Sequence, residues 1–268
     1  MPYFNTQDNC SLYYELLGEG PEKPTIVFVN GTLQTTVYWK MVSKAFTNRY
    51  RMLIYDCRGQ GESNLGQAPL TLGQHAEDLK DLLSVLGIEK ASVVGISHGA
   101  RVALNLAEKR PDLIVRMVLC SISTQSSYRA KMIVRSWFEI LQRHSLDAMV
   151  WAAVPIVFGG RFTHENDKVM ERMVKTIVRR NKTASLRVHL EAMQRYPSLA
   201  SQLKKTPFLV LIITGEDDPL VTEAGAAEIA NRCGGRHAVI PHVGHSIPAE
   251  APEEFTRLVL DFLGDVTR

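Results

Sequence analysis

The stretch Ala91-Ser-Val-Val-Gly-Ile-Ser-His-Gly-Ala100 decides the fold that we expect of this chain. Its first four residues favour a β-strand, and residues 101–110, which follow it, are rich in helix formers. A strand that turns sharply into a helix holds Ser97 in a strained backbone conformation and exposes its hydroxyl. Gly95 and Gly99 have no Cβ, so strand and helix can approach closely. The sequence therefore predicts a reactive serine at a strand-to-helix turn.

Strands and helices alternate on both sides of this turn. A strand is predicted at 11–17, and apolar, β-favouring runs occupy residues 25–29, 51–55, 114–119, 208–213 and 237–240. Segments of helical character lie between or after them at 37–46, 71–86, 223–231 and 252–263. Such alternation is typical of a mostly parallel sheet with helices on both faces. In these sheets the functional residues lie at the carboxyl ends of the strands.

A serine hydroxyl is a weak nucleophile, so it needs a histidine to take its proton and a carboxylate to orient that histidine. The predicted strand 208–213 runs into Gly215-Glu-Asp-Asp218, and the strand 237–240 runs into Pro241-His-Val-Gly-His245. A serine, a carboxylate and a histidine thus each follow a strand end, in the chain order Ser, Asp, His. Asp217 and Asp218 both remain candidates for the carboxylate at this point.

The segment 123–205 differs from the rest of the chain. It contains no strong strand signal but helical patterns at 127–142, 146–157, 165–179 and 184–195, and we interpret it as a helical cap inserted into a core of residues 1–122 and 206–268. The segment has 15 lysines and arginines against six acidic residues, a net charge of +9, whereas the rest of the chain carries −6. Amphipathic helices with solvated basic faces are the ordinary explanation. Alternatively, the apolar side of the cap grips an acyl chain or ring, and its basic rim attracts an acidic partner.

Composition limits the classes of protein to which this chain can belong. The chain has 268 residues, a net charge of +3 and 45% hydrophobic residues, which suits one large globular domain or a domain with an insertion. Four widely spaced cysteines without a metal-binding pattern suggest reduced thiols. The N-terminal residues do not resemble a signal peptide, and no apolar run reaches 18 residues. We therefore expect a cytoplasmic protein that binds neither membrane nor nucleic acid.

Taken together, these motifs resemble the α/β-hydrolase superfamily over essentially the whole chain. The matching pieces are Gly95-Ile-Ser-His-Gly99, Asp56-Cys-Arg-Gly-Gln-Gly-Glu-Ser63, Gly215-Glu-Asp-Asp218 and Gly244-His245. The resemblance implies an α/β fold with a mostly parallel central sheet and a helical cap. It also implies that Ser97 is the nucleophile and His245 the base, with His242 as the alternative base. Because the family acid usually stands three residues after the strand-end glycine, the resemblance favours Asp218 over Asp217.

One motif departs from the family pattern. Where the family usually has His-Gly after its third strand, this chain has Asn30-Gly31. The oxyanion hole is made by backbone N–H groups, for which we expect Thr32 and His98 to be the donors. The Asn-Gly-x-x-x-Thr-Thr run resembles that loop in bacterial 3-hydroxyacyl transferases, and some enol-lactone hydrolases have an asparagine near this position. We expect the substrate pocket to be lined by Asn30, Trp137 and Trp151.

The remaining histidines do not suggest a metal site. His98 is expected to line the pocket, since neighbouring residues on a turn point apart. His75, His144, His164 and His189 are far apart in the sequence and are expected on the surface without clustering. No zinc-binding spacing and no nucleotide-binding glycine motif occurs, so we expect no metal and no cofactor.

The sequence thus predicts a serine hydrolase of an ester, lactone or thioester, which works through an acyl-enzyme on Ser97. One alternative is an acyltransferase that moves a (3-hydroxy)acyl group between acyl carrier protein or CoA and an acceptor. Hydrolysis of C–C bonds and a non-catalytic binding role are further alternatives. The expected partners are a small acyl substrate and, at the basic cap, CoA or an acyl carrier protein; a homodimer is left open.

Overall fold

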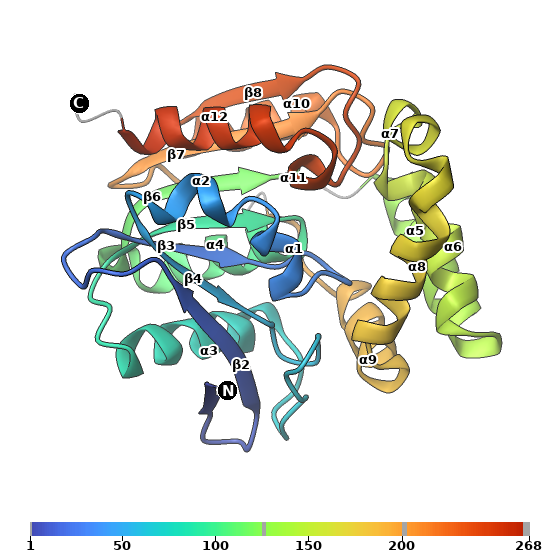
Figure 1. Ribbon diagram of the computed structural model, residues 1–268, viewed down its shortest axis with the longest axis horizontal. Coiled ribbons are helices and arrows are strands. Elements are labelled where there is room, and N and C mark those ends of the chain that lie inside the picture. Colours follow the sequence, from blue (N-terminus) through green and yellow to red (C-terminus); the bar gives the residue numbers. More distant parts are fainter. Residues whose placement is uncertain (1, 125–126, 200–202, 265–268) are drawn as a thin grey trace.

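The architecture is a single mostly parallel sheet, as predicted (Figure 1). A computed structural model describes residues 2–124, 127–199 and 203–264, and within these ranges eight strands pair in the order β1-β2-β4-β3-β5-β6-β7-β8. The first two pairings, β1 with β2 and β2 with β4, are antiparallel, and the other five are parallel. The strands are β1 (Tyr3–Asn5), β2 (Ser11–Leu17), β3 (Thr25–Val29), β4 (Arg51–Tyr55), β5 (Ala91–Ile96), β6 (Ile114–Cys120), β7 (Leu209–Gly215) and β8 (Arg236–Ile240).

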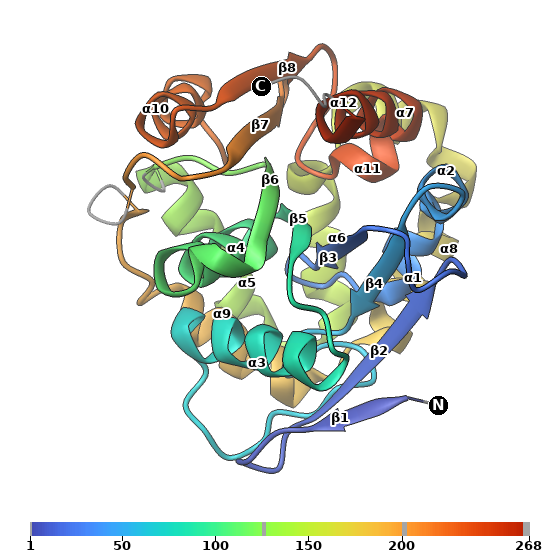
Figure 2. The ribbon, with the colours of Figure 1, turned by 90° about the vertical axis from the view of Figure 1, so that its left-hand side faces the viewer.

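Helices cover both faces of the sheet, because the central strands are apolar on both sides. In β5, Val93 belongs to one buried hydrophobic cluster and its neighbour Val94 to the other. Figure 2 shows the two helical layers on opposite sides of the strands. One layer contains α3 (Leu72–Val85), α4 (His98–Lys109) and α10 (Glu223–Cys233), with a 3₁₀ turn at Pro111–Leu113; the other contains α1 (Thr36–Lys40), α2 (Ser43–Thr47), α11 (Ile247–Glu250) and α12 (Pro252–Gly264).

The chain between β6 and β7 forms a layer of helices beyond the carboxyl ends of the parallel strands, on the right in Figure 1. This cap has a hydrophobic cluster of its own. Ser127 and Ser145 begin two of its helices by accepting hydrogen bonds from the N–H groups of Ala130 and Ala148. The helices are α5 (Tyr128–Arg143), α6 (Leu146–Val157), α7 (Gly160–Glu165), α8 (Asp167–Arg180) and α9 (Thr183–Met193).

Most predicted elements lie where the sequence places them, and the differences are in short elements. The expected helix near 37–46 is two short helices, α1 and α2, and the short helix α7 has no counterpart in the prediction. Helices of five or six residues carry too little periodic pattern to be read from sequence. The division of the chain into a core and a cap at 122/123 and 205/206 stays an interpretation.

Two expectations drawn from the composition, on the cysteines and on membrane-spanning segments, can be compared with the structure. The four cysteines are buried and form no disulfide among the described residues. Within that same part of the chain, no helix combines the length and the apolar character that crossing a bilayer requires.

Candidate active site

Ser97 lies at a tight turn between β5 and α4. Its backbone has φ 54° and ψ −111°, a conformation that residues with a side chain rarely adopt. A Cβ on Gly99 would overlap the carbonyl oxygen of Val29, and a Cβ on Gly95 would collide with the backbone of Gly99. Both glycines are therefore required by close backbone approach, as the sequence predicts.

Asp218 and His245 form a hydrogen-bonded pair at the carboxyl ends of β7 and β8. Oδ2 of Asp218 lies 2.7 Å from Nδ1 of His245, and both residues are buried. The other carboxylate oxygen of Asp218 accepts a hydrogen bond from the N–H of Leu220 at 2.8 Å. Ser121 donates its hydroxyl to the carbonyl of His245 at 2.7 Å. The imidazole is thus held with Nε2 available to a second partner, which is the orientation that a general base needs.

The two alternatives drawn from the sequence lie elsewhere. Asp217 is exposed. His242 is also exposed, and its Nδ1 lies 3.8 Å from a carboxylate oxygen of Glu216. The structure therefore brings Asp218, and not Asp217, to His245.

Ser97 and His245 line the same cavity, which has a volume of about 830 Å³ and lies between the sheet and the cap. Apolar side chains from α5, α6 and α8 make up much of its wall. Four cationic side chains of the cap also line it, namely Lys131, Arg135, Arg172 and Arg180. A cavity of this size with largely apolar walls is typical of a small-molecule site.

Two backbone N–H groups, that of Thr32 in the loop after β3 and that of His98 at the start of α4, are candidate donors for an oxyanion hole. The N–H of Gly31 donates to Oε1 of Gln34 at 2.8 Å and is therefore occupied. For the N–H groups of Thr32 and His98 we find no acceptor among the described residues, and that of His98 is the first of helix α4. These are the two donors that the sequence predicts for the oxyanion hole.

Asp56 holds the loop that contains Thr32. Its carboxylate accepts hydrogen bonds from the N–H groups of Thr36 at 2.6 Å and Glu62 at 2.9 Å. Burial raises the pKa of Asp56, and these two hydrogen bonds act in the opposite direction. The Asp56-to-Ser63 motif is therefore a structural clamp on the loop after β3.

The sequence gives no hint of the role of Glu250. Its carboxylate accepts hydrogen bonds from the N–H groups of Gly244 and Gly159, both at 2.8 Å, and of Ser246 at 3.0 Å. Burial raises the pKa of Glu250, and the hydrogen bonds counteract the effect. This one side chain ties the loop of His245 to the start of α7 in the cap. A signal for it is absent from the sequence because its partners are backbone groups.

Four residues were expected to line the pocket, and three of them, Asn30, Trp151 and His98, do not line the cavity, so those predictions were wrong. Asn30 is fully buried: its Nδ2 donates to the carbonyl of Tyr55, and its Oδ1 accepts from the indole of Trp39. Trp151 is 41% exposed on the cap and does not line the cavity. Trp137 does line it. A helical sequence pattern predicts on which face of its helix a residue lies, but it does not predict whether another element of the fold covers that face.

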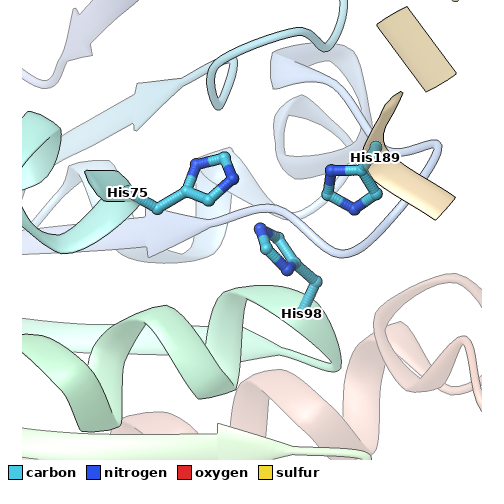
Figure 3. Close-up of side chains that lie close together, drawn as sticks. All are labelled: His75, His98 and His189. Atoms are coloured by element: carbon cyan, nitrogen blue, oxygen red, sulfur yellow. The ribbon is translucent and has the colours of Figure 1, made fainter. Parts of the chain in front are cut away.

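The expectation that the histidines do not cluster was also wrong. His75 of α3, His98 of α4 and His189 of α9 meet in the interior, each about 1% exposed (Figure 3). Burial lowers the pKa of His75 and of His189 to about 3, and it lowers the pKa of His98 well below its usual value. The ring of His98 faces this cluster and not the cavity. Only His144 and His164 are exposed as expected.

Comparisons with known proteins agree with this architecture. Residues 24–252 match the family model described as the alpha/beta hydrolase fold. The crystal structure of MGS-M2, an alpha/beta hydrolase enzyme from a deep-sea metagenome library, is similar with a TM-score of 0.92 and 28% identity, covering 100% of this chain and 98% of the other.

Two curated relatives are similar over most of their length. One, from Caulobacter sp. (strain K31), is provisionally named carbamate hydrolase RutD and is 26% identical over 257 residues, 94% of this chain and 95% of the relative. The other, 3-oxoadipate enol-lactonase 1 of Acinetobacter baylyi, is 26% identical over 252 residues, 92% of this chain and 91% of the relative. With the sheet order, the turn at Ser97 and the family match in agreement, this chain belongs to the family of enzymes with the alpha/beta hydrolase fold.

Proposed function

We propose that this protein is a serine hydrolase that cleaves a carboxylic ester, lactone or thioester through an acyl-enzyme on Ser97. The observation that carries the proposal is the Asp218–His245 pair, 2.7 Å apart, in the wall of the cavity that Ser97 also lines. The names of the relatives support a hydrolase but include different substrates, so the acyl group is the open part of the proposal.

The proposed reaction has two halves. His245 takes the proton of the Ser97 hydroxyl as Oγ attacks the carbonyl carbon, and Asp218 stabilises the imidazolium. The N–H groups of Thr32 and His98 hold the oxyanion, a contribution worth about 10²–10³ in rate for a single donor. The imidazolium then gives its proton to the leaving alcohol or thiol. In the second half, His245 takes a proton from a water molecule as the water attacks the acyl carbonyl. The bond between Oγ of Ser97 and the acyl carbon then breaks, the imidazolium returns the proton to Oγ, and the acid is released.

Transfer of the acyl group to a thiol or hydroxyl acceptor is the second candidate. It uses the same acyl-enzyme, with the acceptor in place of water. The four cationic side chains of the cap that line the cavity support it, because CoA and acyl carrier protein present phosphate groups or acidic surfaces.

Mass spectrometry of the intact protein tests the proposal. Wild type and Ser97→Ala are mixed with a p-nitrophenyl ester, an acyl-CoA, an enol lactone and a carbamate. We expect burst release and an acyl adduct in wild type alone, and the donor with the highest kcat/KM defines the substrate class. An adduct cleared by thiol or alcohol but not by water supports transfer. Equal adducts in both proteins, or turnover by Ser97→Ala at the wild-type rate, would contradict a nucleophilic Ser97.

A further inference from the structure

The cluster of His75, His98 and His189 is the strongest feature that the proposed reaction does not use. These residues come from α3, from the first residue of α4 and from α9 of the cap, so both core and cap contribute to the cluster. One ring nitrogen of each lies within 4.8 Å of the others. In Figure 3 the three rings enter from different sides and converge on one space. A ligand set for one ion requires such convergence of donor atoms.

Buried polar atoms without partners concentrate at this place. Among the described residues, they include Nε2 of His75, both ring nitrogens of His98, Nδ1 of His189 and the hydroxyl of Tyr196, whose ring stacks on His98 at 5.8 Å. An unsatisfied buried polar group is costly and calls for a missing partner, such as water or an ion. An ion that accepts a lone pair from one nitrogen of each imidazole would give three of these five atoms a partner.

We propose that His75, His98 and His189 bind one transition-metal ion of the zinc class. Imidazole nitrogen is a preferred ligand of zinc, copper and nickel, and three protein ligands are sufficient for a zinc site. Among the described residues the cluster consists of imidazoles without a carboxylate, whereas magnesium and calcium prefer oxygen ligands.

The ring arrangement fits such an ion after a small contraction. Neighbouring rings are steeply tilted, with centroids 4.6 Å apart for His75 and His98 and 4.5 Å for His98 and His189. Tetrahedral coordination at about 2.1 Å places ligand nitrogens roughly 3.4 Å apart, so the nitrogens must move inward by on the order of 1 Å. Small side-chain rotations within one rotamer well are sufficient for this.

A second contact resembles the support that metal-binding histidines usually have. Nε2 of His189 lies 3.1 Å from the hydroxyl of Thr32, while Nδ1 is the unpartnered nitrogen. A ligating histidine commonly uses its other nitrogen for such a hydrogen bond, which fixes the ring. Of the two arginines whose charge acts on the cluster, Arg58 is paired with the carboxylates of Asp8 and Asp78, and Arg101 lies near His98. The ion would tie α9 of the cap to the core beside the loop of Thr32.

Metal titration of untagged, chelator-treated full-length protein tests this proposal. Co²⁺ binding is followed by visible absorption and Zn²⁺ binding by calorimetry. We expect one ion per chain in wild type, and an affinity at least about 100-fold lower in His75→Gln and in His189→Gln. His164→Gln, which changes an exposed histidine of α7, is the matched control and should bind as wild type does. Wild type without stoichiometric binding, as expected if water fills the cluster, or unchanged affinity in both variants overturns the proposal.

A second measurement does not depend on the variants being folded. X-ray absorption of the Co²⁺ form of wild type should be fitted by three imidazole nitrogens at about 2.1 Å. A shell of oxygen atoms alone, as at an adventitious surface site, contradicts the assignment. Neither readout requires hydrolytic activity, so failure of the proposed function and failure of the metal site are distinguishable.

Discussion

The hydroxyl of Thr32 lies 3.1 Å from Nε2 of His189 and 3.3 Å from the sulfur of Met193, and thereby joins the loop after β3 to helix α9 of the cap. The N–H group of the same threonine is one of the two proposed oxyanion donors. The structure therefore links the cap to the loop that carries a proposed oxyanion donor.

Replacement of Thr32 by valine tests this link. The substitution keeps the backbone N–H of Thr32 but removes both of its side-chain contacts. We therefore expect kcat to fall about tenfold with little change in KM, which is less than the loss expected when a whole oxyanion donor is removed. His189→Phe should lower kcat similarly. The kcat of the double variant should be little lower than that of either single variant, because both substitutions remove the same contact. Fully additive losses would argue that the two residues act independently.

Asp218→Asn should lower kcat by about 10⁴-fold, because an amide in place of the carboxylate favours the wrong tautomer of His245 and cannot stabilise its cation. Asp217→Asn is the matched control, since that carboxylate is exposed and one position away. Steady-state kinetics with the preferred donor measures both. A larger loss in Asp217→Asn than in Asp218→Asn is incompatible with the roles proposed here.

Glu250→Gln should reduce both stability and activity. The two carboxylate oxygens of Glu250 together accept hydrogen bonds from three backbone N–H groups, and the substitution replaces one of these oxygens with an amide nitrogen, which cannot accept. We expect the free energy of unfolding to fall by about 1–3 kcal/mol. The loop of His245 would lose its anchor to the cap, so kcat should also fall. Denaturant unfolding and kinetics are compared with Glu253→Gln, an exposed glutamate on α12 that should behave as wild type.

The ion pair of Asp8 with the buried guanidinium of Arg58 should make the free energy of unfolding depend on pH. Its hydrogen bonds lower the pKa of Asp8, although burial partly opposes the shift. A carboxylate with a lowered folded-state pKa contributes stability that is present above its unfolded pKa, about 3.9, and is lost as the pH falls below that value. Asp8→Asn should therefore lower the free energy of unfolding by about 1–3 kcal/mol at pH 7, with a smaller difference at pH 3. An equal difference at both pH values would speak against the assignment.

Gly99→Ala should abolish the turn geometry at Ser97. The new Cβ would overlap backbone carbonyl groups of Val29 and Asn30, which cannot move aside as a flexible side chain can. We expect a loss of about 3 kcal/mol or more in the free energy of unfolding, together with loss of activity. Gly160→Ala on α7 is the control, because a Cβ there meets nothing within 4 Å. Thermal unfolding of the two variants makes the comparison.

Local sequence determined the sheet, the turn at Ser97 and the order Ser, Asp, His. These depend on strand periodicity, on glycines at close backbone contacts and on the rule that parallel strands end at one edge. The family resemblance favoured Asp218 over Asp217, and the tertiary structure brings Asp218 to His245. Tertiary structure alone decided that Asn30 is a buried bridge and that Glu250 anchors the loop of His245. It also brought together His75, His98 and His189, which are 23 and 91 residues apart along the chain. Such contacts join segments through the packing of the cap on the core, and no local pattern encodes the position of an inserted layer of helices.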